Sequence, residues 1–339
     1  MFLIRNAEPS DFKALAKLAH ILDSYNLPSD AKVLKELLGH TKRAFHGKSI
    51  PPEARKFLFV SEDVISKNVV GCSLLIARHG TPRMPHIAFR VGDERKKSDT
   101  IRRSVRHQTL KLYVNREGFT EIGGLVILPP FRGLKEHVGK QLSYARFAYM
   151  AWHPTRFRPK VLVEFLPELD PIKGNKFWDV LGARFTHLSY READRLSIHD
   201  KEFILSLFPT EKLYCGLLPK SAIKDLGVPG PGAKASIRVL EKIGFRYLKQ
   251  VDPFDGGPHY GAARQTIPIV RATRFLKVPK KERTRTILKK SGFVMKSDQH
   301  STRALVTPYG VRDAFISLPS QAIDLLALKG GERVSVTPL

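Results

Sequence analysis

The amino-acid sequence predicts an α+β protein, in which helices flank a mixed sheet and a small β-rich, barrel-like domain follows. Three observations support this prediction. An apolar, β-branched segment at 122–128 leads through a turn with proline and glycine into a helical pattern. Strands and helices alternate up to about residue 265, and from Thr266 short strands alternate with turns. We therefore expect two domains, residues 1–265 and residues 266–339.

The N-terminal part begins with a strand and a helix and continues with a hairpin. Leu34, Leu37 and Leu38 recur at helical spacing and predict a helix over Ala31–Phe45. An earlier helix runs from Asp11 to His20, and strands are expected at Phe2–Ala7, Lys56–Glu62, Val69–Arg78 and His86–Val91. The basic segment Asp93–Arg106 then reads as a loop. It is either a solvated charged loop or a patch for phosphate groups or nucleic acid.

The segment Thr120–Met150 organises the rest of the chain. Its strand ends at Pro129-Pro130, because proline cannot donate to a sheet ladder. A short turn follows, and a helix begins at about Glu136. We expect His107–Val114 to pair with the strand Thr120–Leu128, and Lys160–Leu166 to lie parallel to it across the helical crossover.

The turn before this helix has the features of an anion site. The first N–H groups of a helix lack internal partners and lie at the positive end of the helix dipole. Gly133 and Gly139 would let backbone approach a phosphate, and Arg132, Lys135 and Lys140 add positive charge. The alternative is a surface turn with ordinary lysines before a core helix.

The second half of the chain reads as short helices, a glycine-rich loop and then strands. Helices are expected at Asn175–Leu181, Asp200–Phe208, Lys220–Leu226 and Ala233–Ile243, and strands at Phe185–Tyr190 and Phe245–Val251. Asp252–Pro258 forms a tight loop, since its two glycines permit unusual backbone conformations. In the C-terminal domain we expect strands Ile267–Arg271, Ala304–Thr307, Ala314–Leu318 and Arg333–Val336, a helix Pro319–Ala327 and a basic run Lys277–Lys290.

Charge and cysteine content limit the possible functions. The 58 Lys and Arg residues outnumber the 32 Asp and Glu residues and give a formal charge of +26. Such a surplus favours polyanionic ligands. Cys72 and Cys215 lie in apolar settings and are expected to be buried free thiols in a reducing cytoplasm, so we expect no disulfide framework and no metal site. No apolar run is long enough to predict a membrane span.

Several motifs resemble those of one enzyme family. The run LVILPPFRGLKEHVGKQL resembles the acyl-CoA-binding motif of the GNAT acyltransferase superfamily, with its second glycine displaced. The segments NKFWDVLGARF (Asn175–Phe185), VLEKIGFRY (Val239–Tyr247) and DPFDGGP (Asp252–Pro258) resemble arginine N-succinyltransferase. This resemblance extends from Met1 to about Thr273, and FDGGP is its most specific part.

The resemblance implies a GNAT-like fold and transfer of a succinyl group from succinyl-CoA to the α-amine of L-arginine, by direct attack on the thioester. No cofactor would be bound permanently, and a homo- or hetero-oligomer is possible. The expected acyl-CoA ligands are Leu125, Val126, Ile127, Arg132, Gly133, Lys135, Gly139 and Lys140.

Three residues are candidates for the proton transfers that amine acylation needs. Glu164 lies in an apolar strand, where burial would raise the pKa of its carboxyl towards the range of a general base. The alternative is a glutamate at an edge or in a salt bridge. His259 and Tyr260, directly after the FDGGP loop, are the next candidates.

The sequence also departs from the family pattern. The family's proton-donor histidine would fall at about Gly230, and no histidine occurs between His199 and His259. The family's arginine after the strand glutamate is replaced by Phe165-Leu166. Therefore either His259 takes the role of the family histidine, or the chemistry differs from that of the family, or the activity is lost.

Two aspartates are candidates for binding the substrate. Asp252 and Asp255 could pair with an arginine guanidinium, although Asp255 could equally cap its own turn. The alternative function, motivated by the missing histidine and the positive charge, is a catalytically diverged homologue that acts as a basic nucleic-acid-binding or regulatory protein.

Overall fold

The computed structural model describes residues 1–22, 26–47, 50–168, 175–280, 288, 290–298 and 301–338. The chain divides into two compact units. The first unit comprises Met1–Arg78, Thr120–Val161 and Ala263–Leu339, and the second comprises His79–Phe119 and Leu162–Ala262. The division into residues 1–265 and 266–339 stays a prediction.

The first unit contains a sheet with helices on both of its faces. Its strands lie in the order β1-β2-β3-β6. The strands are β1 (Phe2–Asn6), β2 (Lys56–Asp63), β3 (Val69–His79) and β6 (Phe119–Ile127), and the helices are α1 (Phe12–Leu22), α2 (Ala31–Phe45), α3 (Val138–Trp152) and α10 (Pro268–Ala272). Short 3-10 helices occur at Pro9–Asp11, Pro52–Ala54, Pro129–Phe131, Pro154–Arg156 and Arg264–Thr266. The predicted N-terminal strands, hairpin and helices are confirmed.

Successive side chains of β2 point alternately to the two faces of this sheet and show what packs on each face. Leu58 and Val60 belong to the apolar cluster that includes the buried leucines of α1 and α2. Phe57 and Phe59 point the other way, with ring centroids 5.0 and 5.5 Å from that of Tyr149 on α3. The sheet is therefore buried on both faces.

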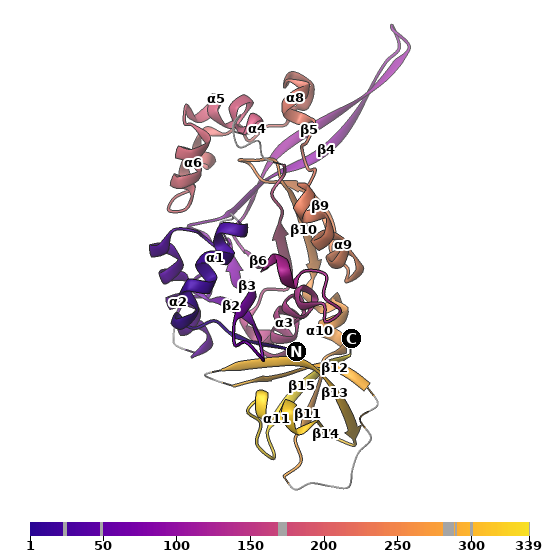
Figure 1. The fold of residues 1–339 in the computed structure, drawn as a ribbon. Coiled ribbons are helices and arrows are strands. Elements are labelled where there is room, and N and C mark those ends of the chain that lie inside the picture. The colour runs from indigo at the N-terminus through magenta and orange to yellow at the C-terminus, as the bar shows by residue number, and fades with distance from the viewer. Residues whose placement is uncertain are drawn as a thin grey trace. The chain divides into compact units, whose positions relative to one another are not determined.

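A closed five-stranded barrel forms the C-terminal part of the first unit. Its strand order is β12-β15-β11-β14-β13, and β13 pairs back with β12. The elements are β11 (Arg274–Lys277), β12 (Lys290–Ser297), β13 (Thr302–Arg312), β14 (Phe315–Ser317), α11 (Ser320–Leu325) and β15 (Arg333–Pro338), drawn in orange to yellow in Figure 1. The predicted β-rich, barrel-like character of this part of the chain is thus confirmed.

One predicted barrel strand is wrong. Ile267–Arg271 is not a strand but the helix α10, which begins at Pro268 because proline suits the first helical turn. Of the basic run Lys277–Lys290, residues 281–287 and 289 lie outside the described residues.

The second unit carries a sheet with the strand order β7-β10-β9-β4-β5-β8. The strands are β4 (His86–Ser98), β5 (Arg103–Asn115), β7 (Lys160–Glu164, whose first two residues belong to the first unit), β8 (Leu213–Tyr214), β9 (Arg246–Val251) and β10 (Pro258–Ala263). The helices are α4 (Lys176–Val180), α5 (Gly182–Thr186), α6 (Tyr190–Ser197), α7 (Glu202–Leu207), α8 (Lys220–Ile223) and α9 (Lys234–Lys242), with 3-10 turns at Cys215–Leu217 and Pro231–Ala233.

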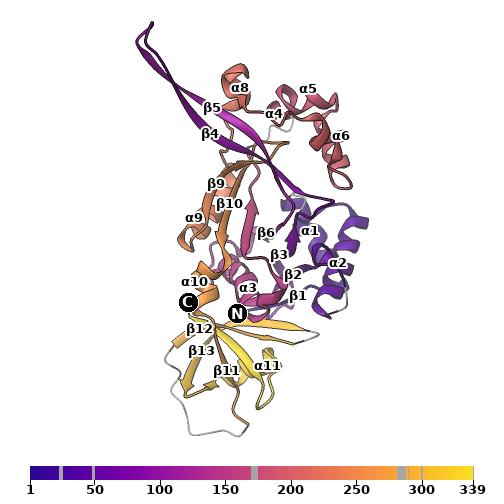
Figure 2. The same ribbon diagram turned by 180° about the vertical axis from the view of Figure 1, so that it is seen from behind.

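Three predictions for this unit are wrong. The basic segment Asp93–Arg106 is not a loop but the end of a long β4–β5 hairpin, which Figures 1 and 2 show extending past the helices of its own unit. Consequently His107–Val114 pairs with β4 and not with Thr120–Leu128. Phe185–Tyr190 is not a strand, because α5 continues to Thr186 and α6 starts at Tyr190.

Cys72 and Cys215 are buried free thiols, as expected. Among the described residues, no helix has the length and apolar character needed to cross a membrane.

Candidate active site

The predicted anion-binding turn lies in the first unit and is open to solvent. A 3-10 turn over Pro129–Phe131 precedes it, and α3 begins at Val138. Gly133 has a φ of +73°, and nothing lies within 4 Å of a Cβ added there, so the left-handed backbone explains this glycine. The side chains of Arg132, Lys135 and Lys140 are exposed. The turn therefore presents three cations near the start of α3.

The expected acyl-contact residues of β6 lie on two faces. Val126 is 5% exposed and belongs to the core packed against α1 and α2. Leu125 and Ile127 are half-buried. Arg132 folds back so that its Nε donates a hydrogen bond to the carbonyl of Ile127 over 2.9 Å. Gly139 lies in the first turn of α3, and a Cβ there would sit 3.7 Å from Ile127. The turn and the end of β6 are thus directly connected.

A second cluster forms around Glu164, entirely within the second unit. Glu164 is the last residue of β7, and its Oε1 lies 3.3 Å from Nδ1 of His86 and 3.8 Å from Nε2 of His259. His79 Nε2 lies 3.8 Å from the same oxygen. Three imidazoles therefore surround one carboxylate oxygen. Of these, only His259 is a candidate by sequence.

Burial distinguishes the members of this Glu164 cluster. His86 is 1% exposed and His259 is 0% exposed, whereas the side chain of Glu164 is 29% exposed. Neither ring nitrogen of His259 has a hydrogen-bond partner among the described residues, and the same holds for Nε2 of His86. Buried polar atoms without partners are costly, and a catalytic role or a bound water or ion is one explanation for them.

Two glycines hold the backbone that follows Glu164. The N–H of Phe165 donates to the carbonyl of Pro258 over 3.2 Å, and the N–H of Gly230 donates to the carbonyl of Leu166 over 3.0 Å. A Cβ on Gly257 would lie 2.2 Å from the carbonyl oxygen of Phe165. Only glycine allows this approach without displacing the backbone, so the FDGGP loop fixes the end of β7.

The position of the missing family histidine is also crowded. A Cβ on Gly230 would lie 3.0 Å from the carbonyl oxygen of Pro167 and 3.3 Å from the backbone nitrogen of Glu168. A histidine there would require this backbone to move. His259, in contrast, already lies within 4 Å of Glu164.

The two candidate substrate aspartates stabilise the FDGGP turn. Asp252 Oδ1 accepts hydrogen bonds from the N–H groups of Phe254 and Asp255, at 2.7 and 3.1 Å. Asp255 Oδ1 accepts from the N–H of Gly257 over 2.7 Å, so the turn-capping alternative for Asp255 is observed. A role in substrate binding would use the second oxygen of each carboxyl.

The ionisation states in the cluster diverge. Burial would raise the pKa of Glu164, but the three imidazoles outweigh burial and hold it well below its ordinary value. The expectation of a raised pKa for Glu164 is therefore wrong. Burial lowers the pKa of His86 and of His259, although the Glu164 carboxylate opposes this.

The neighbouring aspartates shift in the opposite direction. Burial raises the pKa of Asp252, and the charge of Glu164 raises it further. Burial, followed by the charge of Asp252, raises the pKa of Asp255 well above its ordinary value. Groups with pKa values driven apart in this way are typical of acid–base sites.

Tyr260 does not join the cluster. It follows His259 on β10, and successive strand residues point to opposite faces. Its ring centroid lies 5.7 Å from that of Phe165 and 5.8 Å from that of Tyr247. His86 and His79, which the sequence analysis did not select, lie at the site instead.

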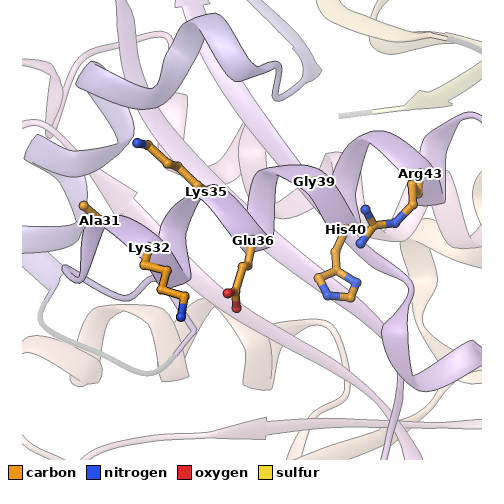
Figure 3. A pocket seen from close by; sticks show the side chains of 7 residues that line it. All are labelled: Ala31, Lys32, Lys35, Glu36, Gly39, His40 and Arg43. Carbon is orange, nitrogen blue, oxygen red and sulfur yellow. The ribbon is translucent and has the colours of Figure 1, made fainter.

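Two hollows of the structure differ in their volume and in the residues that line them. A small cavity of about 30 Å³ is lined by His79, His86, Ile87, Glu164, Lys201, Ile204, Asp252, Pro253 and Phe254. The larger hollow, about 610 Å³, is lined by seven residues that all belong to α2, as Figure 3 shows. A hollow lined by one helix face is open surface, so the small cavity marks the candidate site.

A half-buried carboxylate among imidazoles can accept and return protons, so the second unit carries a candidate acid–base centre. Comparison with known proteins identifies the family. The model of the arginine N-succinyltransferase beta subunit family matches residues 2–269, and the chain belongs to this family.

Similar proteins agree with the family model. The arginine N-succinyltransferase of Enterobacter sp. (strain 638) is 31% identical over 281 residues, covering 82% of this chain and 80% of the relative. That of Citrobacter koseri is 28% identical over 342 residues, covering 100% and 98%. The solved structure of arginine/ornithine succinyltransferase subunit AI from Pseudomonas aeruginosa has a TM-score of 0.79 and 25% identity, covering 100% of this chain and 98% of that one. The α+β fold is thereby confirmed.

Proposed function

We propose that this protein transfers the succinyl group of succinyl-CoA to the α-amine of L-arginine. The observation that carries the proposal is the Glu164 cluster, in a chain of the arginine N-succinyltransferase family. The amine nitrogen attacks the thioester carbonyl carbon, an amide C–N bond forms, and the C–S bond breaks. Each turnover yields one amide, one free CoA thiol and one net proton from the substrate ammonium.

The Glu164 cluster supplies the proton acceptor. The ammonium group of arginine must lose a proton before its nitrogen can attack. Burial favours the neutral imidazole of His259, which would accept this proton, and the nearby Glu164 carboxylate would stabilise the imidazolium that forms. The cavity of about 30 Å³ is lined by Glu164 but not by His259, and it has room for one water molecule beside the carboxylate. In this scheme His259 takes the place of the family histidine.

The exposed turn after β6 is the proposed CoA-binding segment. Arg132, Lys135 and Lys140 would neutralise phosphate charges, and Gly133 and Gly139 would present backbone N–H groups at the start of α3. Leu125 and Ile127 would contact the acyl chain. Val126 would contribute its backbone, because its side chain lies in the core. This arrangement is the GNAT-like part of the proposal.

The acceptor amine is placed by the two aspartates. Asp252 and Asp255 use Oδ1 for their own turn, which leaves Oδ2 of each for a guanidinium. A guanidinium would also favour their ionised forms, since opposite charges lower carboxyl pKa values. All the relatives described above carry the names of succinyltransferases, so the nucleic-acid-binding alternative has no support from the comparisons.

The proposal is tested by a panel of thiol-release assays. Succinyl-CoA and acetyl-CoA are each combined with arginine, ornithine or lysine. We expect the highest kcat/KM for succinyl-CoA with arginine. Turnover confined to another pair would replace the proposed substrates, and no turnover with any pair, alongside measurable CoA binding, would refute the catalytic proposal.

A further inference from the structure

Two histidines and one glutamate of the second unit form a triad with the geometry of a metal site. His79 ends β3, His86 begins β4 and Glu164 ends β7. One possible ligand atom from each lies within 4.8 Å of the other two. His86 Nδ1 and His79 Nε2 are 3.3 and 3.8 Å from Glu164 Oε1. The proposed acylation uses His259 and Glu164, and it gives neither His79 nor His86 a chemical role.

These separations fit the coordination of a small divalent ion. Zinc binds imidazole nitrogen and carboxylate oxygen at about 2.0–2.2 Å, which places two tetrahedral ligand atoms roughly 3.3–3.5 Å apart. The pair formed by His86 and Glu164 is already at this distance, and His79 is a few tenths of an ångström beyond it. Two histidines with one glutamate also form a known ligand set of zinc sites that keep an open position.

The surroundings provide space and an additional negative group. The cavity of about 30 Å³ is lined by all three residues of the triad and by Asp252. This volume suits an ion with one water molecule. Lys201 lines the same cavity, and its charge acts against a cation.

A second triad competes for the same carboxylate. Ligand atoms of Glu164, Asp252 and His259 also lie within 4.8 Å of one another. His259 is fully buried, whereas His79 is 24% exposed and gives an entering ion a route to its ligand. We propose that His79, His86 and Glu164 bind one divalent transition-metal ion of the zinc type, and that Asp252 and His259 flank it. This differs from the sequence expectation of no metal site.

The test uses the full-length protein after treatment with EDTA and removal of the chelator. Cobalt(II) is titrated while its visible absorption is recorded, and zinc(II) is titrated by calorimetry. We expect one ion per chain, with the intense visible bands of cobalt in a low-coordinate site. His79→Ala should weaken binding at least about tenfold, and Glu164→Gln should do the same.

His107→Ala is the matched control. His107 is a half-buried histidine of the same unit, and its ring lies against Tyr214, outside the triad. This variant should bind the ion as the parent does. Circular dichroism confirms that each variant is folded, and His79→Gln replaces His79→Ala if the latter does not fold.

Two outcomes would overturn the proposal. One is the lack of stoichiometric binding by the parent protein. The other is unchanged affinity in both His79→Ala and Glu164→Gln, which would place the ion on other histidines. Ion binding does not depend on the proposed acylation. Thiol release by the metal-free protein, measured separately, distinguishes failure of this proposal from failure of the proposed function.

Discussion

Replacing His259 with leucine should separate catalysis from stability. His259 is 0% exposed, and neither of its ring nitrogens has a hydrogen-bond partner among the described residues. A buried polar group without a partner costs about 1–3 kcal/mol, and an apolar residue of similar size removes that cost. Loss of a general base typically lowers the rate by about 10² to 10⁴. His259→Leu should therefore unfold at the same or a higher urea concentration, while its kcat falls by at least about a hundredfold.

The assays are thiol release from succinyl-CoA with arginine, and urea unfolding followed by circular dichroism. His199→Leu, the same change at an exposed histidine of the same unit, serves as control and should keep both properties. The reasoning is refuted if His259→Leu keeps its activity within a few-fold of the parent. A large loss of stability with retained activity would show that the imidazole is a structural part of the core.

Three further predictions test other parts of the account. Arg132→Ala should weaken CoA binding about tenfold or more in calorimetry, as loss of a charge-assisted hydrogen bond does, without lowering the melting temperature. Unchanged affinity would contradict the phosphate-binding assignment. Gly257→Ala should lower the melting temperature and the activity, because its Cβ would lie 2.2 Å from the Phe165 carbonyl; Gly232→Ala, with nothing within 4 Å of its Cβ, should not. Burial, followed by the charge of Asp252, raises the pKa of Asp194 to about 7. The folded state then holds a proton that the unfolded chain releases near pH 4, so this contribution to stability is present at low pH and is lost as pH rises through 7. Asp194→Asn should remove it, and an unchanged difference in melting temperature between pH 5 and pH 8 would contradict this.

Sequence patterns predicted helices and strands correctly where one face of the element is buried. Helix α2 spans Ala31–Phe45 as predicted, because its leucines recur on one face and Asp30 caps its first turn. The end of the β4–β5 hairpin has no apolar periodicity, since it is exposed on both faces. It is held by cross-strand contacts such as the pairing of Arg106 with Asp93 at 2.6 and 2.8 Å.

The candidate site was only partly accessible from sequence. Glu164 stands out as a charge in an apolar strand, and His259 follows a glycine-rich loop. His79 and His86 carry no comparable signal, because their proximity to Glu164 arises from the meeting of strand ends that are distant along the chain. The same proximity reversed the expected pKa shift of Glu164, since burial alone would have raised it.

The most direct test of the central claim is the identity of the product. The parent protein and Glu164→Gln are incubated with succinyl-CoA and arginine, and the products are analysed by mass spectrometry. We predict Nα-succinylarginine and free CoA in equal amounts from the parent. From Glu164→Gln, which should still bind CoA, we predict product formation at least about a hundredfold slower. Absence of succinylarginine from the parent reaction, or equal rates for both proteins, would contradict the account.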